Sequence, residues 1–408
     1  MRLNKAFHIS TVLLGLFPIL KLNHFSILMM IWFVLAIILA ITNKTIKLNK
    51  QYVGTFLVLS FAALMYWIYL PFVTDFKELS KQIVKSLPFI VFPLGFIWNR
   101  KKITLKIVQN IFTVFSFATI ILNVIGWFEV FKNGFMKTWQ ENDFYNPTFR
   151  SFFSNATSLH IPYLGLFSSF TVIYLLYLQL QQKKFKALNS LMILLLLASM
   201  YIYSARMALG CVIISCIFLL WNSINDKKIK FASVFLIPIL TFALFWFSPL
   251  KERYVTVLET DLILPHKEQM PHEVNYRYGI WYCATEIIQD NLFFGVNPDQ
   301  AQYKLNSCYN QFDYESYEDF TKVTYNSHNQ YLDQMIKFGV IGCVIFIICL
   351  VYYIPKSSVL YQAFSIIIGI SFLTENYLDR QMGVVFIALF NTLFVVYKLS
   401  EREKSFSS

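Results

Sequence analysis

The feature that most constrains this chain is an alternation of long apolar runs with short polar breaks. Lipid offers no hydrogen-bond partner to a free backbone group, so a run of about 20 mostly apolar residues is expected to cross a bilayer as a helix. About twelve runs approach that length. They are residues 7–20, 25–42, 52–72, 83–98, 103–130, 159–180, 187–203, 207–221, 231–247, 329–354, 357–374 and 381–398. The alternation predicts an all-α polytopic membrane protein.

Composition and charge agree with this fold class. The chain is 57% hydrophobic and only 14% charged, whereas soluble domains carry about a quarter charged residues. A net charge of +12 would suit a nucleic-acid partner. However, the lysines and arginines cluster in the breaks between apolar runs, as cytoplasmic loops require. We therefore expect a lipid bilayer around the chain and no nucleic acid.

The basic breaks also predict an orientation. If Arg2 and Lys5 are cytoplasmic, the basic breaks near Lys44, Arg100 and Lys227 fall on the same side, as the positive-inside rule demands. Both termini are then cytoplasmic, and the two longest polar connections face outward. We predict helices 1–9 with a short periplasmic loop at 132–158 in residues 1–247, a large periplasmic loop at 248–328, and helices 10–12 with a cytoplasmic tail in residues 329–408.

The large loop has a helical pattern of its own. Apolar residues at 280, 281, 284, 287 and 288 follow the spacing of an amphipathic helix, and Arg277 lies one turn before Trp281. The same loop holds Cys283 and Cys308, which can form a disulfide if the loop faces an oxidising compartment. No clustering of cysteine or histidine indicates a metal site.

Two arginines are candidates for binding an anion. Arg206 occupies the tightest break between two runs, and Arg277 begins the amphipathic helix. A guanidinium binds phosphate through two parallel hydrogen bonds, which lysine cannot reproduce. The alternatives are that Arg206 reaches to lipid headgroups and that Arg277 pairs with a protein carboxylate, Glu375 or Asp379.

His328 closes the large loop and is the candidate base. Asn326 or Ser327 is expected to cap the helix that follows, and the positive end of that helix would keep the imidazole neutral and able to accept a proton. The alternative is a hydrogen-bonded interfacial histidine. Glu375 on the same outer face could orient His328 or pair with an arginine. In the shorter loop, Arg150 and Asn155 either line the same cavity or belong to a solvated loop.

In this order, these features resemble those of the bacterial O-antigen ligase and O-antigen polymerase superfamily. The residues that carry the resemblance are Arg206 between two runs, Arg277 and Trp281 with Gly295 behind them, His328-Asn329 with Leu332, Gly339 and Gly342, and Glu375 before the last run. The chain departs from many members beside Arg206, where Ala205 and Met207 replace the flanking residues of Ser-Arg-Gly.

The resemblance implies a GT-C-like, inverting, metal-independent glycosyltransferase of the bacterial inner membrane that uses no cofactor. Its donor would be a glycan on undecaprenyl diphosphate. Its acceptor would be a sugar hydroxyl, on lipid A–core for a ligase or on another lipid-linked repeat unit for a polymerase. Arg206 and Arg277 would hold the donor diphosphate, and His328, supported by Asn329, would act as base on the acceptor. A transporter of lipid-linked glycans is the alternative from another class, but transporters usually carry internal repeats and charges within their spans.

Overall fold

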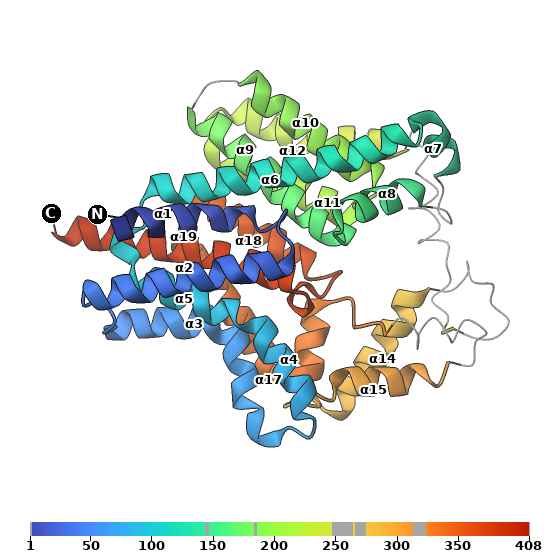
Figure 1. Ribbon diagram of the computed structural model, residues 1–408. Helices are drawn as coiled ribbons and strands as arrows, with labels where there is room; N and C mark the ends of the chain where they lie inside the picture. The colour runs from blue at the N-terminus through green and yellow to red at the C-terminus, as the bar shows by residue number, and fades with distance from the viewer. Residues whose placement is uncertain are drawn as a thin grey trace.

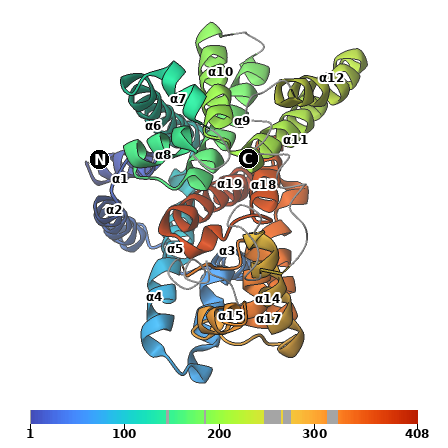
Figure 2. The same cartoon turned by 90° about the vertical axis from the view of Figure 1, so that its right-hand side faces the viewer.

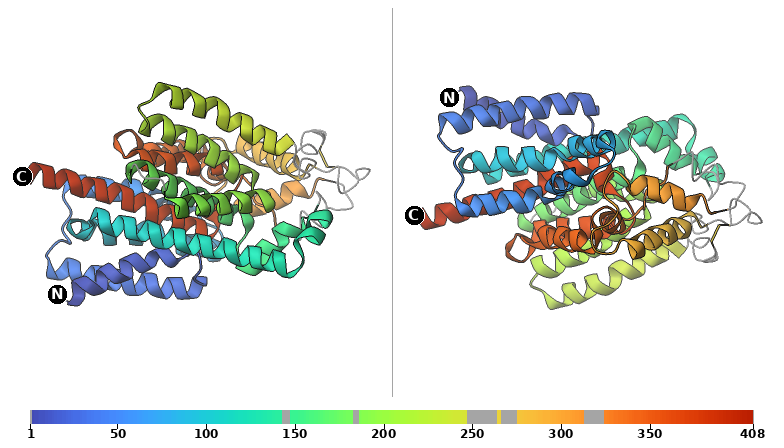
Figure 3. Two further views of the ribbon diagram at one scale, coloured as in Figure 1. Left: turned by 90° about the horizontal axis from the view of Figure 1, so that it is seen from above. Right: turned by 90° about the horizontal axis from the view of Figure 1, so that it is seen from below.

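The computed structural model describes residues 2–142, 147–182, 186–246, 264–265, 275–312 and 324–407. Within these ranges all regular structure is helical. The long helices run side by side, and both chain termini lie at one end of the bundle, here called the terminal end (Figures 1 and 3). Further helices cover the opposite end, here called the far end.

The helices of the bundle are α1 (Arg2–Leu13), α2 (Leu22–Thr42), α3 (Lys50–Ile68), α4 (Phe76–Ser86), α5 (Pro88–Trp98), α6 (Leu105–Lys132), α9 (Ile161–Gln182), α10 (Ala187–Ile202), α11 (Arg206–Ser223), α12 (Lys227–Trp246), α17 (Gln330–Val351), α18 (Val359–Ser371) and α19 (Gln381–Ser407). The helices at the far end are α7 (Phe135–Glu141), α8 (Thr148–Thr157), α14 (Tyr276–Asp290) and α15 (Ala301–Tyr309).

The predicted all-helical fold is confirmed within the described residues, and each predicted apolar run overlaps a helix, which is consistent with a polytopic membrane protein. In the part of the chain that the structure describes, seven helices are long and apolar enough to cross a membrane. They begin at residues 22, 50, 105, 161, 206, 330 and 381, and α10 and α18 are shorter apolar helices. The count of twelve spans stays a prediction.

Two predicted runs are not the single straight helices that the hydropathy suggested. Residues 83–98 contain the end of α4 and all of α5, which begins at Pro88, because proline cannot donate to the preceding turn. Residues 329–354 contain α17, whose backbone is non-helical at Gly339, with φ 67° and ψ −178°. Hydropathy does not register either break, since the side chains around them stay apolar.

Phenylalanine rings form the centre of the bundle. Phe115 of α6 lies 4.8 Å from Phe390 of α19, centroid to centroid, in an edge-to-face arrangement, and Phe170 of α9 lies 5.1 Å from Phe390. Such ring pairs prefer edge-to-face or offset geometry and stabilise a core beyond the area they bury. These ring contacts hold α6, α9 and α19 against one another in the bundle.

Small residues bring α9 and α11 into close contact beside Arg206. A Cβ on Gly165 of α9 would lie 2.9 Å from the Ala208 Cβ and 3.2 Å from the Ala205 Cβ. Ala205 therefore packs closely here, although the Ser-Arg-Gly pattern is absent. Ser204, with φ 52°, ends α10 in the left-handed conformation that closes many helices, and Arg206 becomes the first residue of α11.

The large loop has a hydrophobic core separate from that of the bundle. Ile280, Ala284 and Ile287 are buried on α14, as the periodicity predicts, and they share a cluster with Leu305 of α15 and Ile336 of α17. Seen from the far end, α14, α15 and α17 lie in one half of the molecule, with α6 to α10 in the other and α18 and α19 between them (Figure 2). Ile336 extends this core into α17, past the predicted boundary at residue 328.

Candidate active site

His328 lies in a strained turn before α17. Its φ is 44°, a left-handed value that is uncommon for residues other than glycine. Its backbone N–H donates to the Asn326 Oδ1 at 3.1 Å. The predicted cap is wrong: Asn329 caps α17, with its Oδ1 accepting from Tyr331 and Leu332 N–H. His328 therefore stands outside the helix. The Asn329 side chain is engaged in capping the helix.

Glu375 lies beside the imidazole. The His328 Nδ1 is 3.7 Å from the Glu375 Oε2, and the Glu375 side chain is 9% exposed. Burial raises the pKa of this carboxyl, but interaction with His328 and then with His160 outweighs it, so the net pKa is below the usual glutamate value. Glu375 is thus held as a carboxylate against the Nδ1 edge of the ring, and the Nε2 edge is left for another partner.

Three arginines from three elements sense the charge of one another or of this pair. Burial lowers the pKa of Arg150 on α8, as do the neighbouring charges of Arg206 and Arg277, while Glu375 opposes them. Burial also lowers the pKa of Arg277, and the charge of Glu375 raises it by less. Like charges gathered at one place are unfavourable unless an anion joins them. The arrangement therefore suits an anionic ligand.

The structure gives other surroundings to the remaining predicted residues. Asn155 is on α8 with Arg150, and its side chain is exposed. Asp379 contacts Lys337, not Arg277, so Glu375 is the carboxylate whose charge Arg277 senses. Residues 313–323 of the large loop lie outside the described residues.

His160, which precedes α9, joins the same cluster. Burial lowers the pKa of its imidazole. The charge of Glu375 raises this pKa, and the charges of Arg380, Arg150 and His328 lower it. This histidine was not among the residues selected from the sequence. Its signal was positional, since it stands at the outer end of a predicted run.

A buried ion triad supports the His328 turn. The Lys337 Nζ lies 2.7 Å from the Asp333 Oδ2 and 3.0 Å from the Asp379 Oδ1. The Asp379 Oδ2 accepts a hydrogen bond from the Asn326 Nδ2 at 3.0 Å, and Asn326 in turn holds the backbone N–H of His328. The triad therefore connects α17 and the segment before α19 to the turn that carries the imidazole.

Trp281 brings α14 to the same turn. Its Nε1 donates to the Ser327 carbonyl at 3.2 Å, and Arg277 lies one helical turn before it. The Ser327 hydroxyl is also 3.2 Å from the Asn376 Oδ1, next to Glu375. A short relay of hydrogen bonds thus connects the helix of Arg277, the His328 turn and the Glu375 segment.

Two glycines allow the loop behind α14 to dock on α17. Val296 N–H donates to the Ile336 carbonyl and Val340 N–H to the Leu292 carbonyl, both at 2.8 Å. A Cβ on Gly339 would lie 2.1 Å from the Phe293 oxygen, which no side chain can tolerate. A Cβ on Gly295, which has φ 71°, would lie 2.5 Å from the Ile336 oxygen of α17. These contacts explain why both glycines accompany the site residues.

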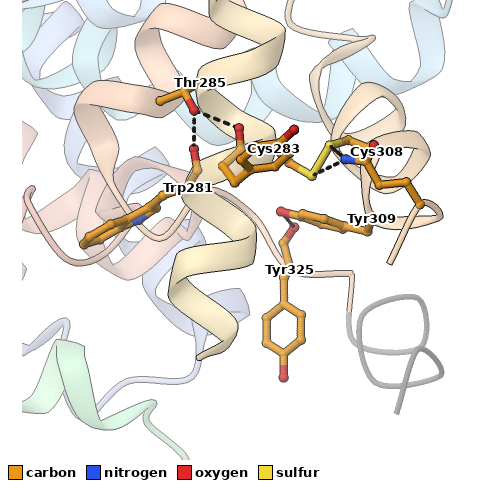
Figure 4. The surroundings of a disulfide bond; sticks show 8 residues. Trp281, Cys283, Thr285, Cys308, Tyr309 and Tyr325 are labelled. Carbon is orange, nitrogen blue, oxygen red and sulfur yellow. Dashed lines mark hydrogen bonds between the residues drawn. A yellow bond between two sulfur atoms is a disulfide. The ribbon is translucent and has the colours of Figure 1, made fainter. Parts of the chain in front are cut away.

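A disulfide joins Cys283 of α14 to Cys308 of α15 (Figure 4). The two Cα atoms are 5.7 Å apart, and Tyr309 beside Cys308 is fully buried in the loop core. This bond fixes the two helices that support the arginine-bearing face. Disulfides persist in oxidising compartments, which agrees with an extracytoplasmic far end.

Replacing both Cys283 and Cys308 by serine is expected to destabilise the far end by about 3 kcal/mol, the chain-entropy value for a closed loop of this size. Limited proteolysis of the purified protein checks this: cleavage between α14 and α15 should accelerate in the double variant. A reductant should accelerate cleavage of the wild type and leave the variant unchanged. Equal cleavage of oxidised wild type and variant would contradict a stabilising role.

Comparison with known proteins connects this geometry to a family. Residues 160–347 match the family model of the O-antigen ligases, a segment that contains His160, Arg206, Arg277 and His328. The resemblance found from the sequence motifs is therefore confirmed over that segment. Arg150 and Glu375 lie outside it. No curated protein matches the chain.

Proposed function

We propose that this protein is an O-antigen ligase-like glycosyltransferase that moves a glycan from undecaprenyl diphosphate to a sugar hydroxyl at the periplasmic face of the bacterial inner membrane. The observation that carries the proposal is the meeting of Arg150, Arg206 and Arg277 with the His328–Glu375 pair, at the end of the bundle opposite both termini. The family match supports lipid-linked glycans as the substrate class.

In the proposed reaction, His328 is the general base. Glu375 orients the ring through Nδ1, and Nε2 takes the proton of the acceptor hydroxyl. The acceptor oxygen then attacks the anomeric carbon while the bond from that carbon to the diphosphate oxygen breaks. A single displacement inverts the configuration. The undecaprenyl diphosphate leaves with the added negative charge, which the arginine cluster stabilises.

Topology supports the proposed orientation. Both termini lie at the terminal end (Figure 1), together with the basic break at η3 (Arg100–Lys102). The disulfide lies at the far end. The positive-inside rule assigns the first to the cytoplasm, and the redox state of the compartments assigns the second to the periplasm.

Replacing Arg277 by lysine is expected to reduce kcat/KM for transfer by about 10- to 100-fold. The substitution keeps the charge but loses the bidentate contact, and hydrogen bonds to charged groups are worth about 1.5–3 kcal/mol. The assay uses purified protein in vesicles with a glycan on undecaprenyl diphosphate. Lys304→Arg, at an exposed position of α15, serves as a matched control. Unchanged transfer by the Arg277 variant would remove the guanidinium from the donor site.

Lipid analysis of a deletion strain distinguishes the alternatives. Loss of a ligase leaves long glycans on undecaprenyl diphosphate, and loss of a polymerase of the same superfamily leaves single repeat units. Accumulation of the donor on the cytoplasmic leaflet would instead identify a transporter of lipid-linked glycans and overturn the proposal. Complementation with the wild-type chain must restore the normal lipid pattern.

A further inference from the structure

A cavity lies at the opposite end of the molecule from His328. Its volume is about 610 Å³, and its walls come from the start of α3, the segment after α17 and the C-terminal part of α19. These three segments meet at the terminal end (Figure 3), which the proposed orientation places at the cytoplasmic leaflet. Neither the arginine cluster nor the His328 pair contributes to it.

The rim of this cavity is cationic. Lys50 of α3 and Lys398 and Arg402 of α19 line it, and none of the described residues that line it is an aspartate or glutamate. The Lys398 Nζ also lies 3.9 Å from the half-exposed Glu401 carboxylate. Basic pockets between helices at the cytoplasmic surface are suited to phosphate-bearing headgroups.

Tyrosines give the rim a defined shape. The Tyr353 hydroxyl is 2.9 Å from the Thr55 Oγ1, which ties the segment after α17 to α3. Tyr352 packs edge-to-face on Tyr353, with centroids 4.9 Å apart. Tyrosine combines an apolar ring with a polar tip and is favoured at membrane interfaces for that reason.

The inner wall of the cavity is hydrocarbon. Val58, Phe394 and Val395 line it. Val58 also borders a smaller apolar cavity of about 30 Å³ between α3 and α17, with Leu59, Phe346 and Leu350. Val58 therefore lines both spaces, and the lining changes from cationic residues at the rim to apolar residues further along α3.

We infer that this cavity binds an anionic glycerophospholipid of the cytoplasmic leaflet. Its phosphate lies between Lys50, Lys398 and Arg402, and an acyl chain follows Val58 into the bundle. A soluble phosphate compound shares the rim chemistry but would leave the apolar wall of Val58, Phe394 and Val395 uncovered, whereas an acyl chain would cover it.

Gly54→Phe tests the site with little risk to the fold. Gly54 lines the cavity, and a Cβ built on it meets no atom within 4 Å, so the phenyl ring would occupy the proposed lipid position. Gly210 of α11 also has open space around its Cβ and does not line the cavity. Gly210→Phe is therefore the matched control for adding the same ring to a membrane helix.

The measurement is native mass spectrometry of the full chain in phosphatidylcholine nanodiscs titrated with phosphatidylglycerol. Gly54→Phe should weaken retention of phosphatidylglycerol by at least about tenfold, while Gly210→Phe retains it like the wild type. A Lys50→Gln/Lys398→Gln double variant should lose the preference for phosphatidylglycerol over phosphatidylcholine. That charge variant decides the matter if Gly54→Phe does not fold.

Two outcomes overturn the inference. The first is equal retention of phosphatidylglycerol by the wild type, Gly54→Phe and the charge variant. The second is displacement of bound phosphatidylglycerol by millimolar inorganic phosphate or a nucleotide with equal efficiency in wild type and Gly210→Phe, which would assign the rim to a soluble phosphate compound. Because donor transfer is not part of the readout, the result is independent of the proposed function.

Discussion

Replacing His328 by alanine is expected to reduce glycan transfer by about 10²- to 10⁴-fold, the range for removal of a general base. The loss should appear in kcat, since the donor is held by the arginines and its binding does not require the imidazole. Transfer is measured with purified protein in vesicles, and the amount of inserted protein is checked by immunoblot.

Two further variants make this result specific. Glu375→Gln keeps the size of the side chain but removes the charge that faces Nδ1, so it should lower kcat by less than His328→Ala. His24→Ala changes an exposed histidine of α2 and should leave transfer unchanged. Full transfer by His328→Ala at normal protein level would exclude the imidazole as base, and a loss of only donor binding would make it a binding residue.

Hydropathy and periodicity predicted the helices well because each depends on residues that are neighbours in sequence. The buried face of α14 follows directly from the spacing of Ile280, Ala284 and Ile287. The kink at Gly339 was not predicted, because it depends on Phe293 approaching from a distant segment. Likewise, the cap of α17 shifted from Asn326 to Asn329, since Asn326 is engaged by Asp379.

The residues of the candidate site also differ in whether their neighbours in sequence reveal them. Arg206, Arg277 and His328 could be selected from the sequence because each stands where a polar run meets an apolar one, and a guanidinium or imidazole there has a specific chemistry. Lys337 and Asp333 could not be, because they lie within an apolar run whose average hydropathy hides them. Their partner Asp379 is 42 positions from Lys337, and only the fold brings the two together.

Replacing Lys337 by methionine is expected to destabilise the protein by about 3–5 kcal/mol, the cost of breaking a buried ion pair by removing one partner. Asp333 and Asp379 would remain buried, with side chains only 6% and 18% exposed, without the cation between them. The measurement is thermal unfolding in detergent at neutral pH. A Lys337→Met/Asp333→Leu double variant, which removes one of the two stranded carboxylates, should recover part of the stability.

The pH dependence of this variant gives an independent check. In the wild type, burial raises the pKa of Asp379. The charges of Lys337 and then Lys85 lower this pKa by more than burial raises it, so the net pKa is below the usual aspartate value. Its contribution to stability is therefore complete above the unfolded-state pKa of about 4 and is lost only as the pH falls below it. Without Lys337, burial dominates and Asp379 takes up a proton as the pH falls, which relieves the cost. The stability deficit of Lys337→Met should consequently shrink from pH 7 toward about pH 4. A deficit that is constant across this range would mean that Lys337 stabilises the fold by packing and not by charge.

Because Asp379 also holds Asn326, and Asn326 holds the His328 backbone, the variant should lose transfer activity at temperatures where it is still folded.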